Sequence, residues 1–99
     1  MNSDEQQILK ALREIPGIGK SCALDLLRIG IRKVSDLRDQ DPCRLYGRLN
    51  AITGATHDIC MLYTFRCAVY YASEKHHEKK KLNWWYWKDK TVGSEKPSS

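Results

Sequence analysis

The chain has 99 residues, 41% of them hydrophobic, and its 17 lysine and arginine residues outnumber 12 aspartate and glutamate residues to give a formal net charge of +5. A chain of this length is expected to form one domain with a modest core, which excludes an enzyme with a large enclosed active-site cavity. The positive charge favours anionic partners without identifying one.

The first predicted helix covers residues 4–14. Ser3 and Gln6 have the spacing of a capping box, which satisfies N–H groups at a helix start. Apolar side chains then recur at helical spacing; they are Ile8, Leu12 and Ile15. Pro16 and Gly17 end this helix.

The second predicted helix covers residues 20–29 and follows a second tight turn at Gly19. Gly30 is predicted to close it as a left-handed C-cap. Ser35 then caps a short connecting helix over residues 36–39.

Two longer helices complete the predicted order. Asp41 followed by Pro42 is a strong helix start, and this helix runs to Gly54. Thr56 is predicted to cap the last helix, residues 57–74, which is apolar on nearly every side and therefore belongs at the centre of the fold. Arg66 interrupts a stretch that is too short for a membrane span.

The predicted fold is therefore all-α, with five helices and no strand. The sequence also contains a weak internal repeat, because residues 15–27 (IPGIGKSCALDLL) and 52–63 (ITGATHDICMLY) both have the pattern of a helix, a glycine turn and a second helix. We expect two such hairpins to pack around a pseudo-twofold axis, in one domain over residues 1–90. The tail of residues 91–99 has little to bury and is expected to be disordered.

The glycines of the first hairpin indicate a phosphate-binding site. Gly17 and Gly19 can adopt backbone angles closed to other residues, so that neighbouring N–H groups converge. The start of the following helix adds unpaired N–H groups and partial positive charge, while Lys20 and Ser21 add an ammonium and a hydroxyl group. The alternative is that the glycines only turn the chain between packed helices. The spacing fits neither a nucleotide-triphosphate loop nor a dinucleotide fold.

The stretch PGIGK, followed by Ala23, Leu26 and Gly30, resembles the helix-hairpin-helix motif of sequence-independent DNA-binding proteins. With the second glycine turn and the segments CMLYTFRCAVYYAS and LNWWYWKDK, the chain resembles the small bacterial "pathogenicity locus" family of helix-hairpin-helix proteins. This resemblance implies a doubled motif whose first hairpin holds phosphate through Gly17, Ile18 and Gly19 as backbone donors. The candidate nucleic-acid-binding residues also include Lys20, Ser21, Arg32, Lys33 and Thr56. The second hairpin departs from the pattern, since a single glycine remains and no lysine follows it.

Three tryptophans and a tyrosine occupy four consecutive positions in residues 84–87. A helix cannot direct all four rings to one face, so some rings should cover the core and others should stay exposed. Trp84, Trp85 and Trp87 are the candidate interaction patch. Three roles remain open for it: a structural plug on the long helix, a protein contact, or stacking on unpaired bases.

The four cysteines are Cys22, Cys43, Cys60 and Cys67. They could form disulfides, but the chain opens without a basic and apolar leader, so a reduced, cytoplasmic protein is expected. Their spacing with histidine matches no recognised zinc site, and neither a metal nor a cofactor is expected.

Three function classes were weighed. The first is a monomeric, non-enzymatic module that binds DNA weakly through backbone phosphate without reading sequence. The second is a protein-interaction adaptor that uses the hairpin and the tryptophan-rich segment. The third, an enzyme such as a DNA glycosylase, is not expected because no chain remains to build a base pocket.

Overall fold

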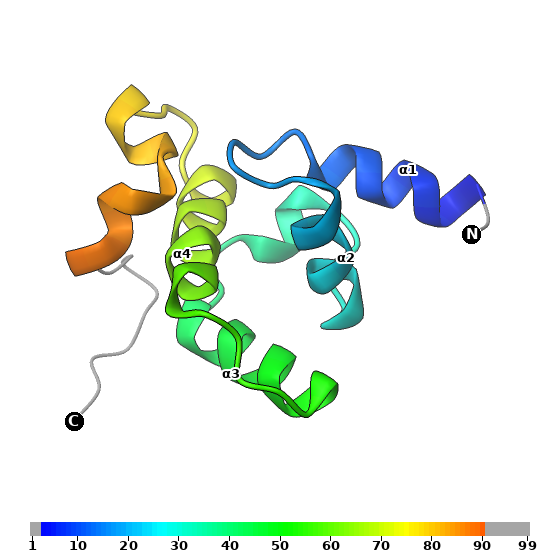
Figure 1. The fold of residues 1–99 in the computed structure, drawn as a ribbon. Helices are drawn as coiled ribbons and strands as arrows, with labels where there is room; N and C mark the ends of the chain where they lie inside the picture. Colours follow the sequence, from blue (N-terminus) through cyan, green and yellow to red (C-terminus); the bar gives the residue numbers. More distant parts are fainter. Residues whose placement is uncertain (1–2, 91–99) are drawn as a thin grey trace.

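Four α-helices and three short 3-10 helices form the computed structural model, which describes residues 3–90 (Figure 1). The α-helices are α1 Ser3–Leu12, α2 Lys20–Arg28, α3 Pro42–Thr53 and α4 Ile59–Ser73. The 3-10 helices are η1 Val34–Leu37, η2 Lys79–Leu82 and η3 Trp84–Asp89. Because no strand occurs between residues 3 and 90, the all-α prediction is confirmed for that range.

The helix count differs from the prediction. The expected third helix is the single 3-10 turn η1. Residues 79–90, called the C-terminal segment, contain two further 3-10 helices that were not predicted, η2 and η3. The tail of residues 91–99 lies outside the described residues, so its expected disorder is not addressed.

The loop between α1 and α2, residues 13–19, is called here the first hairpin loop. α1 ends at Leu12, two residues before its predicted end, because the chain tightens there into short-range turns. Ile15 N–H donates to the Leu12 carbonyl at 3.2 Å, and Ile18 N–H donates to the Ile15 carbonyl at 3.0 Å. Gly17 then takes a φ of 84°, a left-handed angle that reverses the chain.

The end of α2 is the one the sequence predicts. Gly30 has a φ of 94°, and Ile31 N–H donates to the Leu26 carbonyl at 3.0 Å. This is a Schellman C-cap, which satisfies the last carbonyl groups of the helix. The side chain of Ile31 is buried behind the turn and fixes the exit of the chain.

The loop between α3 and α4, residues 54–58, is called here the second hairpin loop. α4 begins two residues later than predicted, and its N-cap is Asp58, whose carboxylate accepts the Cys60 N–H at 2.9 Å. The prediction that Thr56 caps this helix is wrong. Two hydrogen bonds from α3 hold the backbone of His57 outside the helix, so α4 starts after it. The Tyr46 hydroxyl donates to the His57 carbonyl, and Asn50 Oδ1 accepts the His57 N–H at 2.9 Å.

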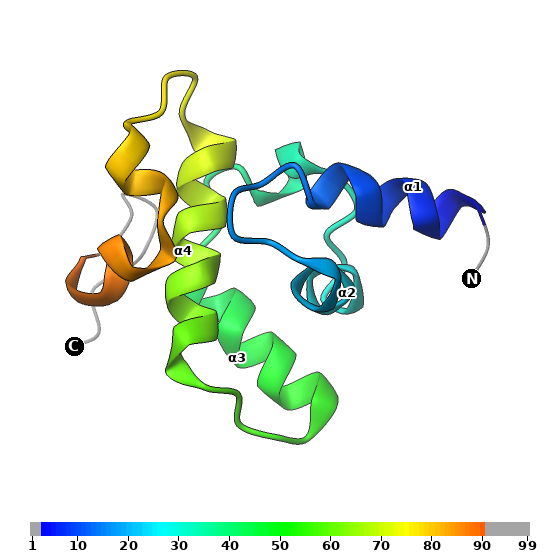
Figure 2. The same ribbon diagram turned by 45° about the horizontal axis from the view of Figure 1, so that its top comes forward.

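α4 lies at the centre of the molecule, as its apolar composition predicts. It contacts α3, η1, η2 and η3, and Figures 1 and 2 show the C-terminal segment and the first hairpin loop on opposite sides of it. Phe65 and Ala68 are fully buried, and Cys67 and Val69 are almost fully buried. No helix within residues 3–90 is long and apolar enough to cross a membrane.

The C-terminal segment is fastened to α4 by its last tryptophan. Trp87 is 5% exposed, and its indole N–H donates to the Lys81 carbonyl at 2.9 Å. Arg66 of α4 donates to the Trp87 carbonyl at 2.9 Å. The role of structural plug therefore applies to Trp87, and its inclusion in an exposed interaction patch is wrong.

Candidate functional site

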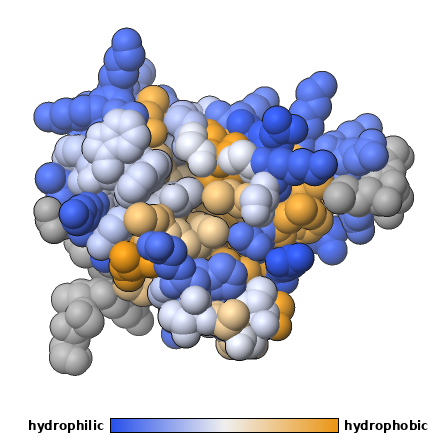
Figure 3. All heavy atoms as spheres, viewed as in Figure 1, coloured by the Kyte–Doolittle hydropathy of each residue, from blue (hydrophilic) through white to orange (hydrophobic). Residues whose placement is uncertain are grey.

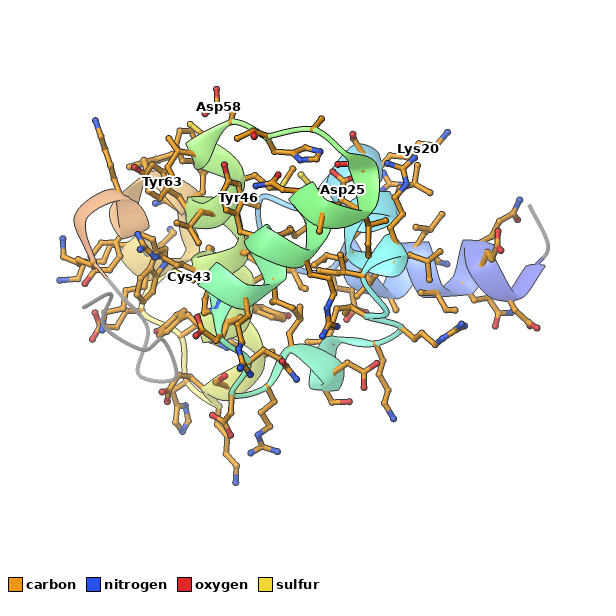
Figure 4. The ribbon with its side chains drawn as sticks, turned by 90° about the horizontal axis from the view of Figure 1, so that it is seen from below. Lys20, Asp25, Cys43, Tyr46, Asp58 and Tyr63 are labelled. Carbon is orange, nitrogen blue, oxygen red and sulfur yellow. The ribbon has the colours of Figure 1, made fainter. Side chains whose placement is uncertain are left out.

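The first hairpin loop presents a polar, exposed surface at the start of α2. Gly17, Gly19, Lys20 and Ser21 are exposed. Ile18 is the exception, since its side chain is 5% exposed and packs in the core. Figure 4 shows Lys20 at the start of α2 with its side chain directed outward. Two buried apolar residues, Ile15 and Ile18, thus anchor the loop to the core, while its glycines and the start of α2 face solvent.

The N–H groups at the start of α2 are available to a ligand. Within residues 3–90, no hydrogen bond engages the backbone N–H of Gly17, Lys20 or Ser21. The first turn of any α-helix has no internal acceptors for these groups. Ile18 does not belong to this set, because its N–H already donates to the Ile15 carbonyl. Its predicted role as a backbone donor is therefore wrong.

Gly19 differs from Gly17 in conformation. It is the N-cap of α2, with a φ of −92° and a ψ of −170°, which is extended backbone open to any residue. The expectation that both glycines take angles closed to other residues thus holds only for Gly17. A Cβ atom added to Gly19 would meet nothing within 4 Å. Nothing inside the described chain requires glycine at this position.

Cys22 stays neutral beside this site. Burial raises the pKa of its thiol, and the nearby Asp25 carboxylate acts in the same direction. A backbone hydrogen bond from Gly19 lowers the pKa but has a smaller effect than these. The thiol therefore remains protonated at neutral pH and brings no negative charge to the start of α2.

The start of α2 is unlike the starts of α3 and α4. Asp41 caps α3 by accepting the Cys43 N–H at 3.0 Å, and Asp58 caps α4 in the same way. The hydrogen bond from Cys60 N–H lowers the pKa of Asp58, so this carboxylate is charged at neutral pH. α2 has neither a side-chain cap nor an acidic residue in its first turn. Of these three helices, only α2 leaves its positive end open.

Cations from two helices gather next to the open end of α2. A shallow groove between α1 and α2 is lined by Gln6, Leu9, Lys10, Arg13 and Lys20. Figure 3 shows hydrophilic side chains over α1 on this face. Lys10 and Arg13 were not among the sequence candidates. Lys10 lies in the last turn of α1 and Arg13 directly follows the helix, so their spacing of three residues brings both side chains to the same side of the chain, and that signal could have identified them.

Arg32 and Lys33 lie away from this groove. Both are exposed, but they follow Gly30, beyond the end of α2 that lies about 12 Å along the helix axis from Lys20. The Arg32 N–H donates to Asp36 Oδ2 at 3.0 Å, which brings a carboxylate to that end. The structure therefore does not bring these two candidates together with the first hairpin loop.

Thr56 is exposed in the second hairpin loop, next to a helix start that Asp58 already occupies. The remaining candidates, Trp84 and Trp85, belong to the C-terminal segment. Trp85 is 60% exposed and Trp84 is half-buried. The interaction patch is thus reduced to one exposed ring with a second at its edge.

The described residues contain no group of three or more His, Cys, Asp or Glu side chains that could hold a metal ion. All four cysteines are described and none is in a disulfide. Burial raises the pKa of Cys67 to about 11, which makes this thiol unreactive at neutral pH. Cys43, in contrast, is exposed rather than packed as a small hydrophobic residue.

Comparison with known proteins places this architecture in a family. A family model named Cdd1, described as "Pathogenicity locus", matches residues 5–92. The chain belongs to the Cdd1 pathogenicity locus family. The match includes both hairpin loops and the C-terminal segment, and of the elements described above it leaves out only the first two residues of α1.

This Cdd1 protein is also similar to the mitomycin resistance protein McrB of Streptomyces lavendulae. The two are 41% identical over 58 residues, which cover 59% of this chain and 55% of the relative. The chain thus spans about half the length of the curated relative it matches. No solved structure matches it.

Proposed function

We propose that this Cdd1 protein is a non-enzymatic DNA-binding module of the helix-hairpin-helix type, which holds backbone phosphate without reading base sequence. The observation that carries the proposal is the uncapped start of α2 on an exposed glycine loop, beside the cations of the groove. Helix starts of this kind are natural anion sites, because unpaired N–H groups and the helix dipole both favour negative charge.

In the proposed complex, one phosphate group lies against the first turn of α2. The N–H groups of Lys20 and Ser21 donate to its oxygens, and the Lys20 ammonium group neutralises its charge. The bare Cα of Gly19 lets the phosphate approach the backbone closely. Lys10 and Arg13 then contact neighbouring phosphates along the strand, so two to four phosphates are held in total.

The second hairpin makes a smaller contribution in this proposal. A phosphate at the start of α4 would meet the charged carboxylate of Asp58, which also uses the N–H group of Cys60. In the doubled motif, the first hairpin therefore binds phosphate alone, and the affinity for DNA is expected to be weak. The name of the Streptomyces relative concerns resistance to mitomycin and specifies no ligand.

The alternative proposal is a protein-interaction adaptor. Trp85 favours it, because large exposed aromatic side chains are frequent in the centres of protein interfaces. An adaptor of this kind would hold its partner at high salt and would depend on Trp85 more than on Lys20.

The first test is the salt dependence of duplex binding. If two to four phosphates are neutralised, the logarithm of the binding constant is expected to fall against the logarithm of salt concentration with a slope of roughly −2 to −4. Fluorescence anisotropy with labelled duplexes of two unrelated sequences measures both the slope and the lack of sequence preference. A slope near zero, or a strong preference for one sequence, would contradict the proposal.

The two loop glycines provide a second test with a built-in control. Gly19→Ala is expected to weaken duplex binding several-fold while changing the free energy of unfolding by less than about 1 kcal/mol, because the backbone there is extended and open. Gly17→Ala is expected to cost about 1–2 kcal/mol of stability, because an alanine is strained at a φ of 84°. Urea denaturation and the duplex titration separate the two effects. Full affinity in Gly19→Ala would show that no phosphate approaches this Cα.

A further inference from the structure

Trp85 is held in the open by the geometry of η3. A 3-10 helix has three residues per turn, so residues three apart lie directly above one another on the same face. Trp87 is 5% exposed and lies in the core, and Tyr86 packs against the same core from the neighbouring position of η3. Trp85 and Lys88 share another face of η3, where Trp85 is 60% exposed and Lys88 is also exposed.

The exposed ring is mounted on a rigid support. The Trp87 indole N–H donates a hydrogen bond to the Lys81 carbonyl, and the Trp87 carbonyl accepts one from Arg66 of α4. The rings of Trp84 and Trp85 meet at 82° with centroids 5.8 Å apart, so Trp84 braces the edge of its neighbour. A ring held in this way loses little conformational freedom when a ligand stacks on it.

The segment that carries Trp85 is rich in lysine, although Lys80 and Lys81 lie 3.9 and 3.7 Å from a Glu78 oxygen and Lys90 lies over the Tyr86 ring. Residues 79–90 contain five lysines and a single aspartate, and Lys79, Lys80, Lys88 and Lys90 are exposed. Figure 3 shows near-neutral side chains bordered by hydrophilic ones over this segment. No other large hydrophobic side chain of the segment is exposed. A single exposed flat ring on a lysine-rich segment complements a base and its phosphates better than it complements an apolar protein surface.

We propose that Trp85 and Lys88 form a second nucleic-acid contact, in which one unpaired base stacks on the indole ring and the ammonium group holds the adjoining phosphate. The ligand class is single-stranded or partly unpaired nucleic acid, because the faces of bases inside a duplex are already stacked. The inference rests on the proposed function in that the ligand is nucleic acid. The contact itself is separate, since α4 lies between η3 and the first hairpin loop (Figures 1 and 2).

The test compares a thymidine homopolymer with a fully paired duplex on the complete chain. Trp85→Ala is expected to weaken binding of the homopolymer by about 5-fold to 100-fold and to leave duplex binding within about 2-fold. Trp85→Phe, which retains a ring, is expected to keep most of the affinity. Thermal denaturation of both variants is expected to match that of the unchanged protein, because Trp85 is exposed. Quenching of tryptophan emission by the homopolymer should be smaller in Trp85→Ala.

The outcomes separate this inference from the proposed function. Equal homopolymer affinity in Trp85→Ala and the unchanged protein would overturn the inference, while a duplex affinity sensitive to Lys20 would leave the hairpin proposal standing. Homopolymer binding that depends on Trp85, with no duplex binding at all, would support the inference and overturn the hairpin proposal. If Trp85→Ala weakens only a salt-resistant contact with a protein, the inference is also overturned.

Discussion

Phe65→Ala is expected to lower the free energy of unfolding by about 3–5 kcal/mol, the range measured when buried aromatic residues are truncated in other proteins. Phe65 is fully buried in the middle of α4, and α4 contacts α3, η1, η2 and η3. The truncation therefore leaves a cavity inside the central helix's packing, which costs contacts as well as buried apolar surface. Urea denaturation followed by circular dichroism measures the loss.

Ile52→Ala is the matched control for this prediction. Ile52 lies in α3 and is 54% exposed, so its truncation should change the free energy of unfolding by no more than about 0.5 kcal/mol. If Phe65→Ala cost as little as Ile52→Ala, α4 would not be the central helix of this fold.

The helix ends show how far the sequence alone can predict this fold. Asp41 with Pro42 and the glycine at position 30 were predicted correctly, because each acts on residues within one turn of itself. The start of α4 was not. Thr56 and Asp58 are both good N-caps, and the choice between them depends on hydrogen bonds from Tyr46 and Asn50 on another helix.

The C-terminal segment was predicted only in outline. Its mixed role, part core and part surface, follows from four aromatic residues in a row. Which ring is buried depends on the 3-10 register, and that register is fixed by the Lys81 carbonyl and by Arg66. These contacts span 6 and 21 residues, beyond the reach of local patterns.

The sequence predicted the exposed glycine loop and Lys20, but it did not predict the roles of Ile18, Lys10 and Arg13. Local sequence indicates an exposed glycine loop and a basic helix start, and the structure has both at Lys20. Local sequence cannot show that the Ile18 N–H donates to the Ile15 carbonyl, because this hydrogen bond depends on where α1 ends. Local sequence also cannot show that Lys10 and Arg13 lie near Lys20, because this proximity arises only when α1 and α2 pack together.

The starts of α2 and α4 differ in how they are capped. The lowered pKa of Asp58 means that the native state binds the proton on this carboxylate less tightly than the unfolded chain does. Its contribution to stability is therefore present above the ordinary aspartate pKa and is lost as the pH falls below it. At neutral pH the start of α4 is stabilised by its own carboxylate, whereas the start of α2 has no side-chain cap.

Lys20→Glu is expected to abolish duplex binding without unfolding the domain. The change removes the ammonium group at the start of α2 and places a carboxylate in its first turn, one residue after the N-cap Gly19. That carboxylate would repel phosphate and compete for the same N–H groups, while the exposed position of Lys20 protects the core from the change.

Lys75→Glu provides the matched control, because it changes the net charge equally at another exposed lysine, beyond the end of α4. In a duplex titration at low salt, Lys75→Glu should reduce affinity only modestly through the overall charge, and thermal denaturation of both variants should match that of the unchanged protein. Equal losses in the two variants would mean that net charge alone attracts DNA and that the first hairpin holds no phosphate. Full affinity in Lys20→Glu would exclude the start of α2 from the interface, and Trp85 would then be the remaining candidate contact for nucleic acid.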